Sequence, residues 1–303
     1  MATIDESLAA LGIAANSLSA LAGDASQRRF YRACDLDGGG LVVAVYPEGA
    51  EAQARRDQAV QCWGWAHGLP IPRPLGWHGL VVASEDLGDL DLERAAAAGQ
   101  PVIAPALAAL AAFQRCEWRS LTTAPFDARL FRQELAVFER HACGVGRRLG
   151  GESAAFLDEL AERLVGHPYR LTHRDFHVNN LFFREGTVRA VDFQDMRGGP
   201  DTYDLVSLFR ERAGAALAVD DAFWLSRAAG ELGWTSGWRQ RYLECAAQRG
   251  LKVVGTFLRL SAAGRPGYLV WLPAVRANAA AALSALHAPT ELVAMVAAPI
   301  PGL

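Results

Sequence analysis

The character of the chain changes near residue 89, and this change constrains the fold more than any other feature of the sequence. Before this point, short runs rich in β-branched and aromatic residues alternate with turns. After it, Ala- and Leu-rich stretches with helical spacing dominate, and one β-rich interruption falls at 171–193. The β-rich runs lie at 29–33, 41–46 and 79–84, and the helical stretches at 3–20, 51–66, 92–113, 127–142, 153–165, 220–250 and 274–287. The pattern predicts an α+β chain with a small β-rich N-terminal lobe and a larger, mainly helical C-terminal lobe.

Length and composition limit the classes of protein to which the chain can belong. Its 303 residues suffice for one large or two smaller domains, 51% of them are apolar, and the formal net charge is −3. These values exclude a disordered chain and a strongly basic nucleic-acid-binding protein. The uncharged stretches 101–114 and 277–290 are shorter than the roughly 20 residues of a membrane-spanning helix, so no membrane partner is expected. Five scattered cysteines without a CxxC pair, and an N-terminus without a basic signal-peptide start, predict a cytoplasmic protein with reduced thiols.

The residues that carry chemistry are concentrated between 171 and 195. His173, Asp175 and Asn180 fit the pattern H-R-D-x-x-x-x-N, in which the Asp receives the proton of a substrate hydroxyl and the Asn holds Mg²⁺. Two short strands follow, and the second one delivers Asp192 to the same end as Asn180. A carboxylate and an amide oxygen brought together in this way predict a Mg²⁺ site completed by the phosphates of ATP.

Simpler interpretations of the same residues remain open. Asp175 after His-Arg could form an ordinary ion pair, and Asn180 with its neighbour Asn179 could be turn residues. The spacing of His173 and His177 would suit a metal pair on a helix, but zinc needs three or four ligands and no Cys or Glu is placed to complete the set. We therefore expect His173 to be a packed, hydrogen-bonded organiser of the loop.

Several strings spread over most of the chain resemble one family. The chain is similar to the aminoglycoside phosphotransferase-like small-molecule kinases, relatives of choline kinase and of the protein-kinase fold. Within that family it looks closest to the bacterial N-acetylmuramate/N-acetylglucosamine anomeric kinases of cell-wall (peptidoglycan) recycling. The strings lie at 24–32, 85–88, 192–195, 199–208 and 250–257, and the last two point to the subfamily.

The resemblance implies a protein-kinase-like, two-lobed fold with ATP in the cleft between the lobes. Residues 1–88 would form the nucleotide-binding lobe with a hinge at 85–88, and residues 89–303 the lobe with the catalytic loop and the substrate site. Further roles are implied for single residues. Ser26 would touch the phosphates, Glu85 and Leu87 would bind adenine through their backbone, Asp204 would brace the catalytic loop, and Asp195 would assist the metal or bind sugar.

The chain departs from the family pattern at the third strand of the N-terminal lobe. Kinases of this fold usually carry a lysine there that holds the α- and β-phosphates. The run 41–46 has no cation, and Lys252 is the only lysine in the whole chain. Arg28 or Arg29 could supply the missing charge. A pseudokinase that binds nucleotide without turnover is the natural alternative, although the retained Asp–Asn–Asp set argues against it.

The sequence also limits the acceptor of the phosphoryl group. Only 11 residues separate Asp192 from Asp204, which is too short for the peptide platform of a protein kinase. The segment 235–278 holds seven cations and one acid, which favours an anionic sugar such as N-acetylmuramate over a polycationic antibiotic. Arg197 is our candidate for a contact to the sugar carboxylate or to phosphate.

We therefore expect a monomeric, ATP- and Mg²⁺-dependent kinase of the anomeric hydroxyl of an N-acetylated amino sugar, with Asp175 as the base. A same-fold kinase of another small alcohol or of an aminoglycoside is the alternative acceptor class.

Overall fold

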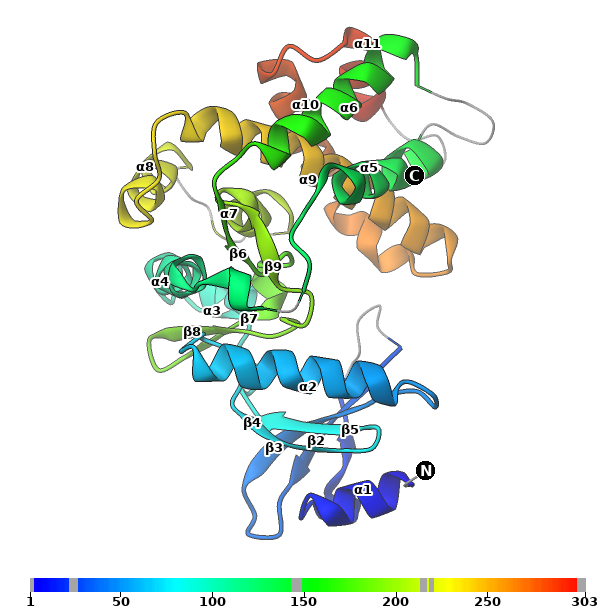
Figure 1. The fold of residues 1–303 in the computed structure, drawn as a ribbon, viewed down its shortest axis with the longest axis vertical. Coiled ribbons are helices and arrows are strands. Elements are labelled where there is room, and N and C mark those ends of the chain that lie inside the picture. Colours follow the sequence, from blue (N-terminus) through cyan, green and yellow to red (C-terminus); the bar gives the residue numbers. More distant parts are fainter. Residues whose placement is uncertain are drawn as a thin grey trace.

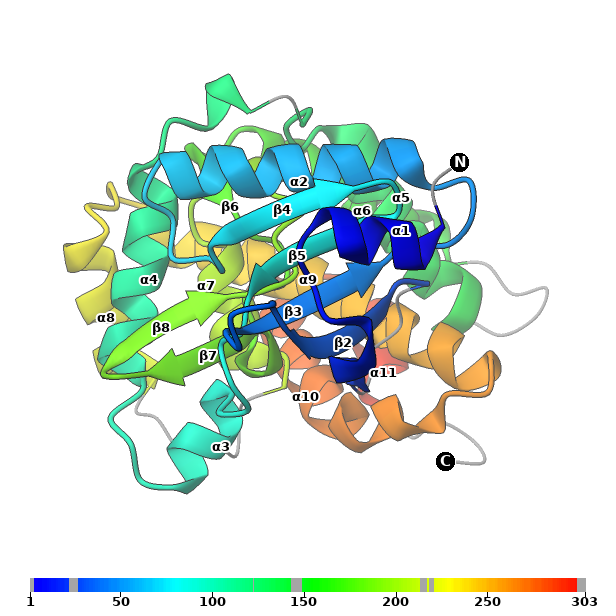
Figure 2. The ribbon, with the colours of Figure 1, turned by 90° about the horizontal axis from the view of Figure 1, so that it is seen from below.

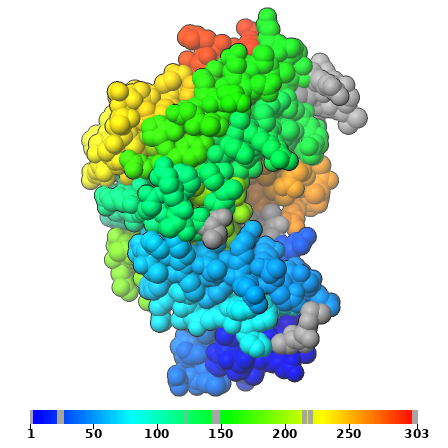
Figure 3. Space-filling model, viewed as in Figure 1, coloured from blue at the N-terminus to red at the C-terminus, as the bar shows by residue number. Residues whose placement is uncertain are grey.

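The computed structural model describes residues 3–21, 27–121, 123–142, 149–212, 217 and 221–298. The chain forms two lobes, as expected from the change of character along the sequence. A five-stranded antiparallel sheet with two helices makes the smaller N-terminal lobe, and the larger lobe is mainly helical (Figure 1). Figure 3 shows the larger lobe, green to red, above the smaller blue-to-cyan one. Ser26 lies outside the described residues.

The N-terminal sheet has the strand order β1-β2-β3-β5-β4. Its elements are α1 (Ile4–Ala10), β1 (Ser19–Ala20), β2 (Arg29–Cys34), β3 (Gly40–Val45), α2 (Glu51–Ala66), β4 (Pro74–His78) and β5 (Val81–Glu85), with a 3₁₀ turn at Ala15–Ser17. Because side chains alternate along a strand, Leu41, Val43 and Val45 of β3 lie on one face, where they pack with Leu8 of α1. The opposite face is covered by α2, whose Ala54 packs with Tyr46 and Val82. The two helices thus lie on opposite faces of the sheet (Figure 2).

This lobe differs from the sequence prediction in one helix boundary and one strand. The predicted helix 3–20 begins as expected at Thr3, whose side chain forms a capping box with Glu6, but it ends at Ala10. Gly12 then adopts a φ of +67°, which turns the chain toward β1. The strand β4 was not predicted, because Pro70, Pro72 and Pro74 indicated a loop; an edge strand tolerates a proline because its outward N–H needs no partner.

The C-terminal lobe is built from helices around two small strand pairs. Its helices are α3 (Leu92–Ala97), α4 (Ile103–Arg115), α5 (Ala128–Ala142), α6 (Gly151–Val165), α7 (Tyr203–Arg210), α8 (Asp221–Glu231), α9 (Trp238–Ala262), α10 (Leu272–Ala285) and α11 (Thr290–Ala297), with short 3₁₀ turns at Trp118–Ser120, Val178–Asn180 and Pro266–Trp271. The strands β6 (Tyr169–Thr172) and β9 (Arg197–Pro200) form one pair, and β7 (Leu181–Arg184) and β8 (Thr187–Ala190) the other. The predicted single helices 92–113 and 220–250 are each divided in two, where Gly99 and Gly237 adopt positive φ angles.

The long helix α9 packs between α5 and α10. Two of its glycines permit this. A Cβ on Gly255 would lie 2.5 Å from the backbone nitrogen of Phe138 in α5, and one on Gly250 would lie 2.7 Å from the Cβ of Ala279 in α10. The glycines therefore let three helix backbones approach closely, which fixes the position of α9 relative to the loop at 173–180.

Gly255→Ala is expected to destabilise the protein by about 1–3 kcal/mol, because the added methyl group overlaps the backbone of α5, which cannot move like a flexible side chain. Gly230→Ala in α8 is the matched control, since a Cβ added at Gly230 would have no atom within 4 Å and alanine favours a helix. Urea unfolding of both variants measures the difference. Equal stability of the two variants would contradict the close approach of α9 and α5.

No helix in the described part of the chain is long and apolar enough to cross a membrane. Four of the five cysteines lie in that part, and all four are free thiols there.

Candidate active site

The loop 173–180 leaves the end of β6 and is held by the first turn of α7. The carboxylate of Asp204 accepts hydrogen bonds from the backbone N–H of His173 at 2.6 Å and from that of Arg174 at 2.9 Å. The bracing contact expected of Asp204 is therefore present. Arg174 has a φ of +80°, an unfavourable conformation for a residue with a side chain, which the two hydrogen bonds to Asp204 hold in place. The result is a fixed backbone immediately before Asp175.

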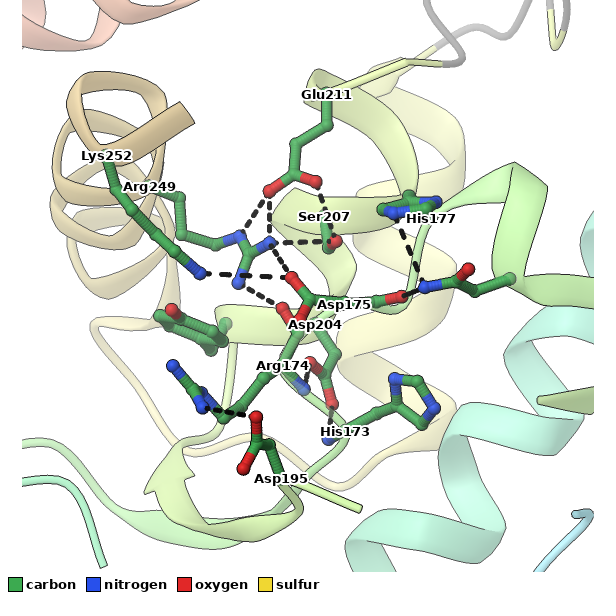
Figure 4. Close-up of polar contacts among 12 residues, drawn as sticks. His173, Arg174, Asp175, His177, Asp195, Asp204, Ser207, Glu211, Arg249 and Lys252 are labelled. Atoms are coloured by element: carbon green, nitrogen blue, oxygen red, sulfur yellow. Dashed lines mark hydrogen bonds and ion pairs between the residues drawn. The ribbon is translucent and has the colours of Figure 1, made fainter. Parts of the chain in front are cut away.

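The side chain of Asp175 faces two cations that come from α9. Its Oδ1 is 3.8 Å from Nζ of Lys252 and 3.8 Å from Nη2 of Arg249, while 39% of the side chain remains exposed (Figure 4). Burial alone would raise the pKa of Asp175, but Lys252, Arg249 and Arg174 together hold it below its ordinary value. The carboxylate is therefore ionised at neutral pH and exposed enough to meet a ligand.

Arg249 is completely buried and is held on all sides. It donates to Glu211 through Nε at 2.7 Å, to Ser207 through Nη2 at 3.0 Å and to the backbone carbonyl of Arg174 through Nη1. Burial alone would lower the pKa of Arg249, but Glu211 and other acidic neighbours raise it above its ordinary value. Because one of its bonds goes to the residue before Asp175, Arg249 anchors the loop to α9.

The other carboxylate of this cluster, Glu134 of α5, is buried. It accepts hydrogen bonds from Nη2 of Arg174 at 2.8 Å and from Gln248 at 2.8 Å, and Nζ of Lys252 is 3.8 Å away. Burial alone would raise the pKa of Glu134, but Lys252 and Arg174 lower it below its ordinary value. Glu134 therefore balances the positive charge beside Asp175.

Asn180 and Asp192 are brought together by the hairpin of β7 and β8, as predicted. The backbone N–H of Val191 donates to the carbonyl of Asn180 at 2.9 Å. The side-chain nitrogen of Asn180 donates to the carbonyl of Asp175 at 3.0 Å, which leaves its Oδ1 for another ligand. Asp192 has a φ of +62° and its carboxylate is 48% exposed. The arrangement offers one amide oxygen and one carboxylate.

The N-terminal lobe contributes Arg28 to this site. Its Nη2 is 3.0 Å from Oδ1 of Asp192, and its Nη1 is 3.5 Å from Oδ2 of Asp57 on α2. The register of β2 against β3 places Arg28, Phe30 and Tyr46 on one face, and the guanidinium carbon lies 5.4 Å and 5.8 Å from the two ring centroids. The guanidinium therefore lies between the two lobes.

Tyr46 stands where the pattern V-A-I-K places a lysine, since Val43-Ala44-Val45-Tyr46 has the same form. Its hydroxyl donates to Asp57 at 2.8 Å. In protein kinases the lysine pairs with an acid on the helix that follows. Here the acid on α2 is paired by Tyr46 and Arg28 instead, so the structure favours Arg28 over the exposed Arg29 as the cation of this lobe.

The segment 85–88 links the lobes, and ion pairs hold it on both sides. Arg32 of β2 binds Asp86 at 2.5 Å, and Arg189 of β8 donates to the carboxylate of Glu85. Leu87 lines a hollow of about 910 Å³ beside this segment. Asp175, Asn180 and Asp192 do not line it, so the hollow is separate from the carboxylate centre.

Asp195 and Arg197 lie beside the loop 173–180. Oδ2 of Asp195 is 3.6 Å from Nη1 of Arg174 and the side chain is largely exposed. Arg197 is paired with Thr172 in the strand that enters the loop, and its guanidinium carbon lies 5.6 Å from the ring centroid of Phe126. Burial, together with the nearby Arg174, lowers the pKa of Arg197 below its ordinary value. Both residues are thus close to Arg174.

The two histidines of the loop form no metal centre. No group of three or more His, Cys, Asp or Glu ligands occurs among the described residues. Burial lowers the pKa of His177 well below its ordinary value, so the ring is neutral. His173 packs edge-on against Phe113 and Phe176, but within the described ranges its ring nitrogens have no hydrogen-bond partner. The prediction of a packed, hydrogen-bonded histidine is confirmed, and the hydrogen bond that the structure shows runs from the backbone N–H of His173 to Asp204.

Residues 17–243 match the profile of the phosphotransferase enzyme family. The chain belongs to this family. Members of this phosphotransferase family use ATP as the phosphoryl donor. The exposed carboxylate of Asp175, with Asn180 bonded to its backbone carbonyl, fits an enzyme of this kind.

Individual relatives of this phosphotransferase are distant. An N-acetylmuramate/N-acetylglucosamine kinase of Pseudomonas aeruginosa is 30% identical over 278 residues, which cover 82% of this chain and 79% of the relative. A protein of the same name from Neisseria meningitidis is 28% identical and covers 80% of this chain and 78% of its own length.

Solved structures confirm the fold. The aminoglycoside phosphotransferase APH(4)-Ia, in a ternary complex with AMP-PNP and hygromycin B, has a TM-score of 0.60 at 19% identity, with 90% of this chain and 94% of that chain covered. A choline/ethanolamine kinase family protein from Mesorhizobium loti has a TM-score of 0.58 at 18% identity, with 92% of each chain covered.

Sequence reasoning missed the residues that surround Asp175. Glu134 and Arg249 gave no local signal, because each comes from a helix distant in the sequence from Asp175, and the same holds for Asp57, which pairs with Arg28. Lys252 did give a signal, since it is the only lysine and falls within one of the strings that carry the family resemblance.

Proposed function

We propose that this chain is a Mg²⁺-dependent kinase that transfers the γ-phosphoryl group of ATP to the anomeric hydroxyl of an N-acetylated amino sugar, N-acetylmuramate or N-acetylglucosamine, in cell-wall recycling. The observation that carries the proposal is the exposed, ionised carboxylate of Asp175, held 3.8 Å from two cations and bonded through its backbone to Asn180. The two relatives that span about four fifths of the chain support the sugar. The acceptor is a small molecule, and the protein acts as a cytoplasmic monomer without nucleic-acid or membrane partners.

Asp175 orients the sugar hydroxyl and takes its proton. Its lowered pKa makes the carboxylate a weak base toward a free hydroxyl. Because the acceptor oxygen becomes acidic only as its bond to phosphorus forms, the proton moves to Asp175 late in the transfer. The main contribution of Asp175 before that point is to hold the hydroxyl in line.

Asn180 and Asp192 are the residues that fit Mg²⁺. One amide oxygen and one carboxylate are hard donors of the type that Mg²⁺ accepts, and phosphate oxygens of ATP would complete the set. A Mg²⁺ ion held by these two residues would neutralise negative charge on the phosphates of ATP. Nη2 of Arg28 lies 3.0 Å from Oδ1 of Asp192, so this carboxylate would serve both the guanidinium and the metal.

The N-terminal lobe, residues 1–88, holds the nucleotide, and residues 89–303 hold the acceptor. Ser26, which lies outside the described residues, and Arg28 serve the phosphates, while Glu85 and Leu87 of the hinge 85–88 meet adenine through their backbone. Asp195 and Arg197 face the sugar, where Arg197 suits a carboxylate.

Arg28→Met is expected to weaken ATP binding by about tenfold, because a hydrogen-bonded cation beside the phosphates is lost. Arg29→Met is the matched control, since the side chain of Arg29 is exposed and lies on the other face of β2 from Arg28. Titration of both variants with ATP and Mg²⁺ measures the effect, and a melting curve shows whether Asp57 tolerates the loss of its partner. An equal effect of the two substitutions would remove Arg28 from the phosphate site.

The experiment that tests the proposed function is ADP release from ATP and Mg²⁺ with N-acetylmuramate, N-acetylglucosamine, kanamycin and choline in parallel. Turnover on the two amino sugars, with a product that loses phosphate in mild acid as a glycosyl phosphate does, is the expected result. Turnover on kanamycin or choline alone would keep the catalytic residues and overturn the acceptor. ATP binding without turnover on any of the four would favour a pseudokinase.

A further inference from the structure

The only lysine of the chain lies beside the carboxylate of Asp175. Lys252 and Arg249 are three residues apart on α9, and therefore share one face of the helix, the face turned toward the loop 173–180 (Figure 4). Gly250 and Gly255, which let α9 approach its neighbours, flank Lys252 in the sequence. The packing of the lobe thus serves to place this ammonium group.

The two cations differ in how many of their hydrogen-bond donors the protein uses. Arg249 is completely buried and its donors are used by Glu211, Ser207 and the carbonyl of Arg174. Lys252 is 17% exposed, and within the described ranges its ammonium makes only two ion pairs, with Glu134 and Asp175, each at 3.8 Å and longer than a hydrogen bond. A largely buried ammonium group with open donors is costly unless a ligand completes it.

We propose that Lys252 is a catalytic residue, whose ammonium group binds the oxygens of the phosphoryl group while that group passes from ATP to the acceptor. The proposal rests on the proposed function, in which Asp175 holds the acceptor hydroxyl. The resting position of Lys252 between Glu134 and Asp175 keeps the ammonium charged, since burial alone would lower its pKa but the acidic neighbours raise it.

The geometry of the transfer brings the phosphoryl group within reach of Lys252. The acceptor oxygen forms a bond to the γ-phosphorus and its proton goes to Asp175, while the bond from phosphorus to the bridging oxygen breaks and ADP leaves with that electron pair. The phosphoryl group is therefore adjacent to the oxygen that Asp175 holds, and an amine 3.8 Å from the same carboxylate can donate to it. Lys252 keeps its proton throughout and neutralises charge that is spread over the phosphoryl oxygens.

A purely structural pairing with Glu134 explains the position of Lys252 less well. Glu134 already accepts two hydrogen bonds at 2.8 Å, from Arg174 and Gln248, and so is satisfied without the lysine. Each lobe thus supplies one cation: Arg28 of the N-terminal lobe for the phosphates of ATP, and Lys252 of the C-terminal lobe for the phosphoryl group during its transfer.

The test uses a planar mimic of the moving group. The affinity for ADP and Mg²⁺ is measured by calorimetry with and without fluoroaluminate, for the wild-type chain, Lys252→Met, Lys252→Arg and the control Arg259→Met, an exposed cation on the same helix. Fluoroaluminate is expected to tighten ADP binding in the wild type and in the control. In Lys252→Met the gain falls by about 10- to 100-fold, as expected for a lost hydrogen bond between charged groups, while the affinity for ADP and Mg²⁺ alone and the melting temperature stay close to those of the wild type. Lys252→Arg keeps part of the gain.

A full fluoroaluminate gain in Lys252→Met would overturn the proposal, as would the absence of any gain in the wild type. The double variant Lys252→Met with Glu134→Gln separates the structural explanation: recovery of the gain when both charges are removed would show that Lys252 only neutralises Glu134. In turnover assays kcat should fall with little change in the sugar KM, whereas a rise in that KM alone would make Lys252 a sugar contact. The complex with ADP, Mg²⁺ and fluoroaluminate contains no sugar, so this result holds even if the amino sugars prove to be the wrong acceptors.

Discussion

Asp175→Asn should lower kcat by about 10²- to 10⁴-fold, the usual contribution of a positioned proton acceptor, while ATP binding is retained. Asparagine has the same shape, so it can still hold the hydroxyl, but it cannot take the proton. The substitution also removes one negative charge beside Lys252 and Arg249. The site becomes more positive, and an anionic nucleotide should bind at least as tightly as before. Single-turnover phosphoryl transfer and calorimetry with ATP and Mg²⁺ measure the two quantities separately.

The matched control for this prediction is Asp37→Asn in the exposed turn between β2 and β3, which should leave both quantities unchanged. Folding of Asp175→Asn is expected to survive, because Glu211 and Glu134 still balance the cations of α9. Wild-type turnover in Asp175→Asn would exclude Asp175 as the proton acceptor. A parallel loss of ATP affinity would instead indicate that its main role is to shape the site.

The parts of this site that were predictable from the sequence are those that local geometry brings together. Asp175, Asn180 and Asp192 lie within one short segment, and the hairpin between the last two obliges their ends to meet. The hydrogen bond from Val191 to the carbonyl of Asn180 is the direct consequence of that pairing. The lobes were predictable for a similar reason, because the period of the apolar residues changes from two to between three and four along the chain.

Residues supplied by distant helices were not predictable in the same way. Arg249 and Lys252 reach Asp175 only because α9 packs closely between α5 and α10, and the glycines that permit this packing do not by themselves indicate which side chains will meet. Likewise, nothing in the sequence of β3 indicates that Tyr46 and Arg28 would share Asp57. Such contacts depend on tertiary packing, which a single sequence does not specify locally.

Tertiary packing also weakens the support that the cations at 235–278 give to an anionic sugar. Most of the cations at 235–278 are used by the protein itself. Arg241 binds Asp201 at 2.7 Å, Arg276 donates to the carbonyl of Val296, and Arg239 lies over Trp238. Of that segment, only Lys252 combines partial exposure with a contact to Asp175. The case for a sugar carboxylate therefore rests on Arg197 and its neighbours, and not on the overall charge of the segment.

Asp192→Ala should abolish the gain in ATP affinity that Mg²⁺ provides. Loss of an outer partner of a metal ligand typically costs roughly 10- to 100-fold in metal affinity, and loss of the carboxylate itself should cost more. Without Mg²⁺ the expected effect has the opposite sign. In the proposed site Asp192 lies beside the phosphates, and in the structure it holds Arg28 at 3.0 Å, so its removal should relieve repulsion and free the guanidinium for the nucleotide. ATP should then bind the variant slightly more tightly than the wild type when metal is chelated.

Calorimetric ATP titrations at a series of Mg²⁺ concentrations, with a chelated sample as the zero point, measure both effects. Asp158→Ala, which removes a largely exposed carboxylate on α6, is the control and should follow the wild-type curve. Without Mg²⁺ the wild type should bind ATP more weakly than Asp192→Ala. Its ATP affinity should then rise with Mg²⁺, whereas that of Asp192→Ala should stay constant, so the two titration curves should cross. A variant whose affinity rises with Mg²⁺ as steeply as that of the wild type would show that Asp192 is no metal ligand. Its ion pair with Arg28 would then be a permanent contact between the lobes.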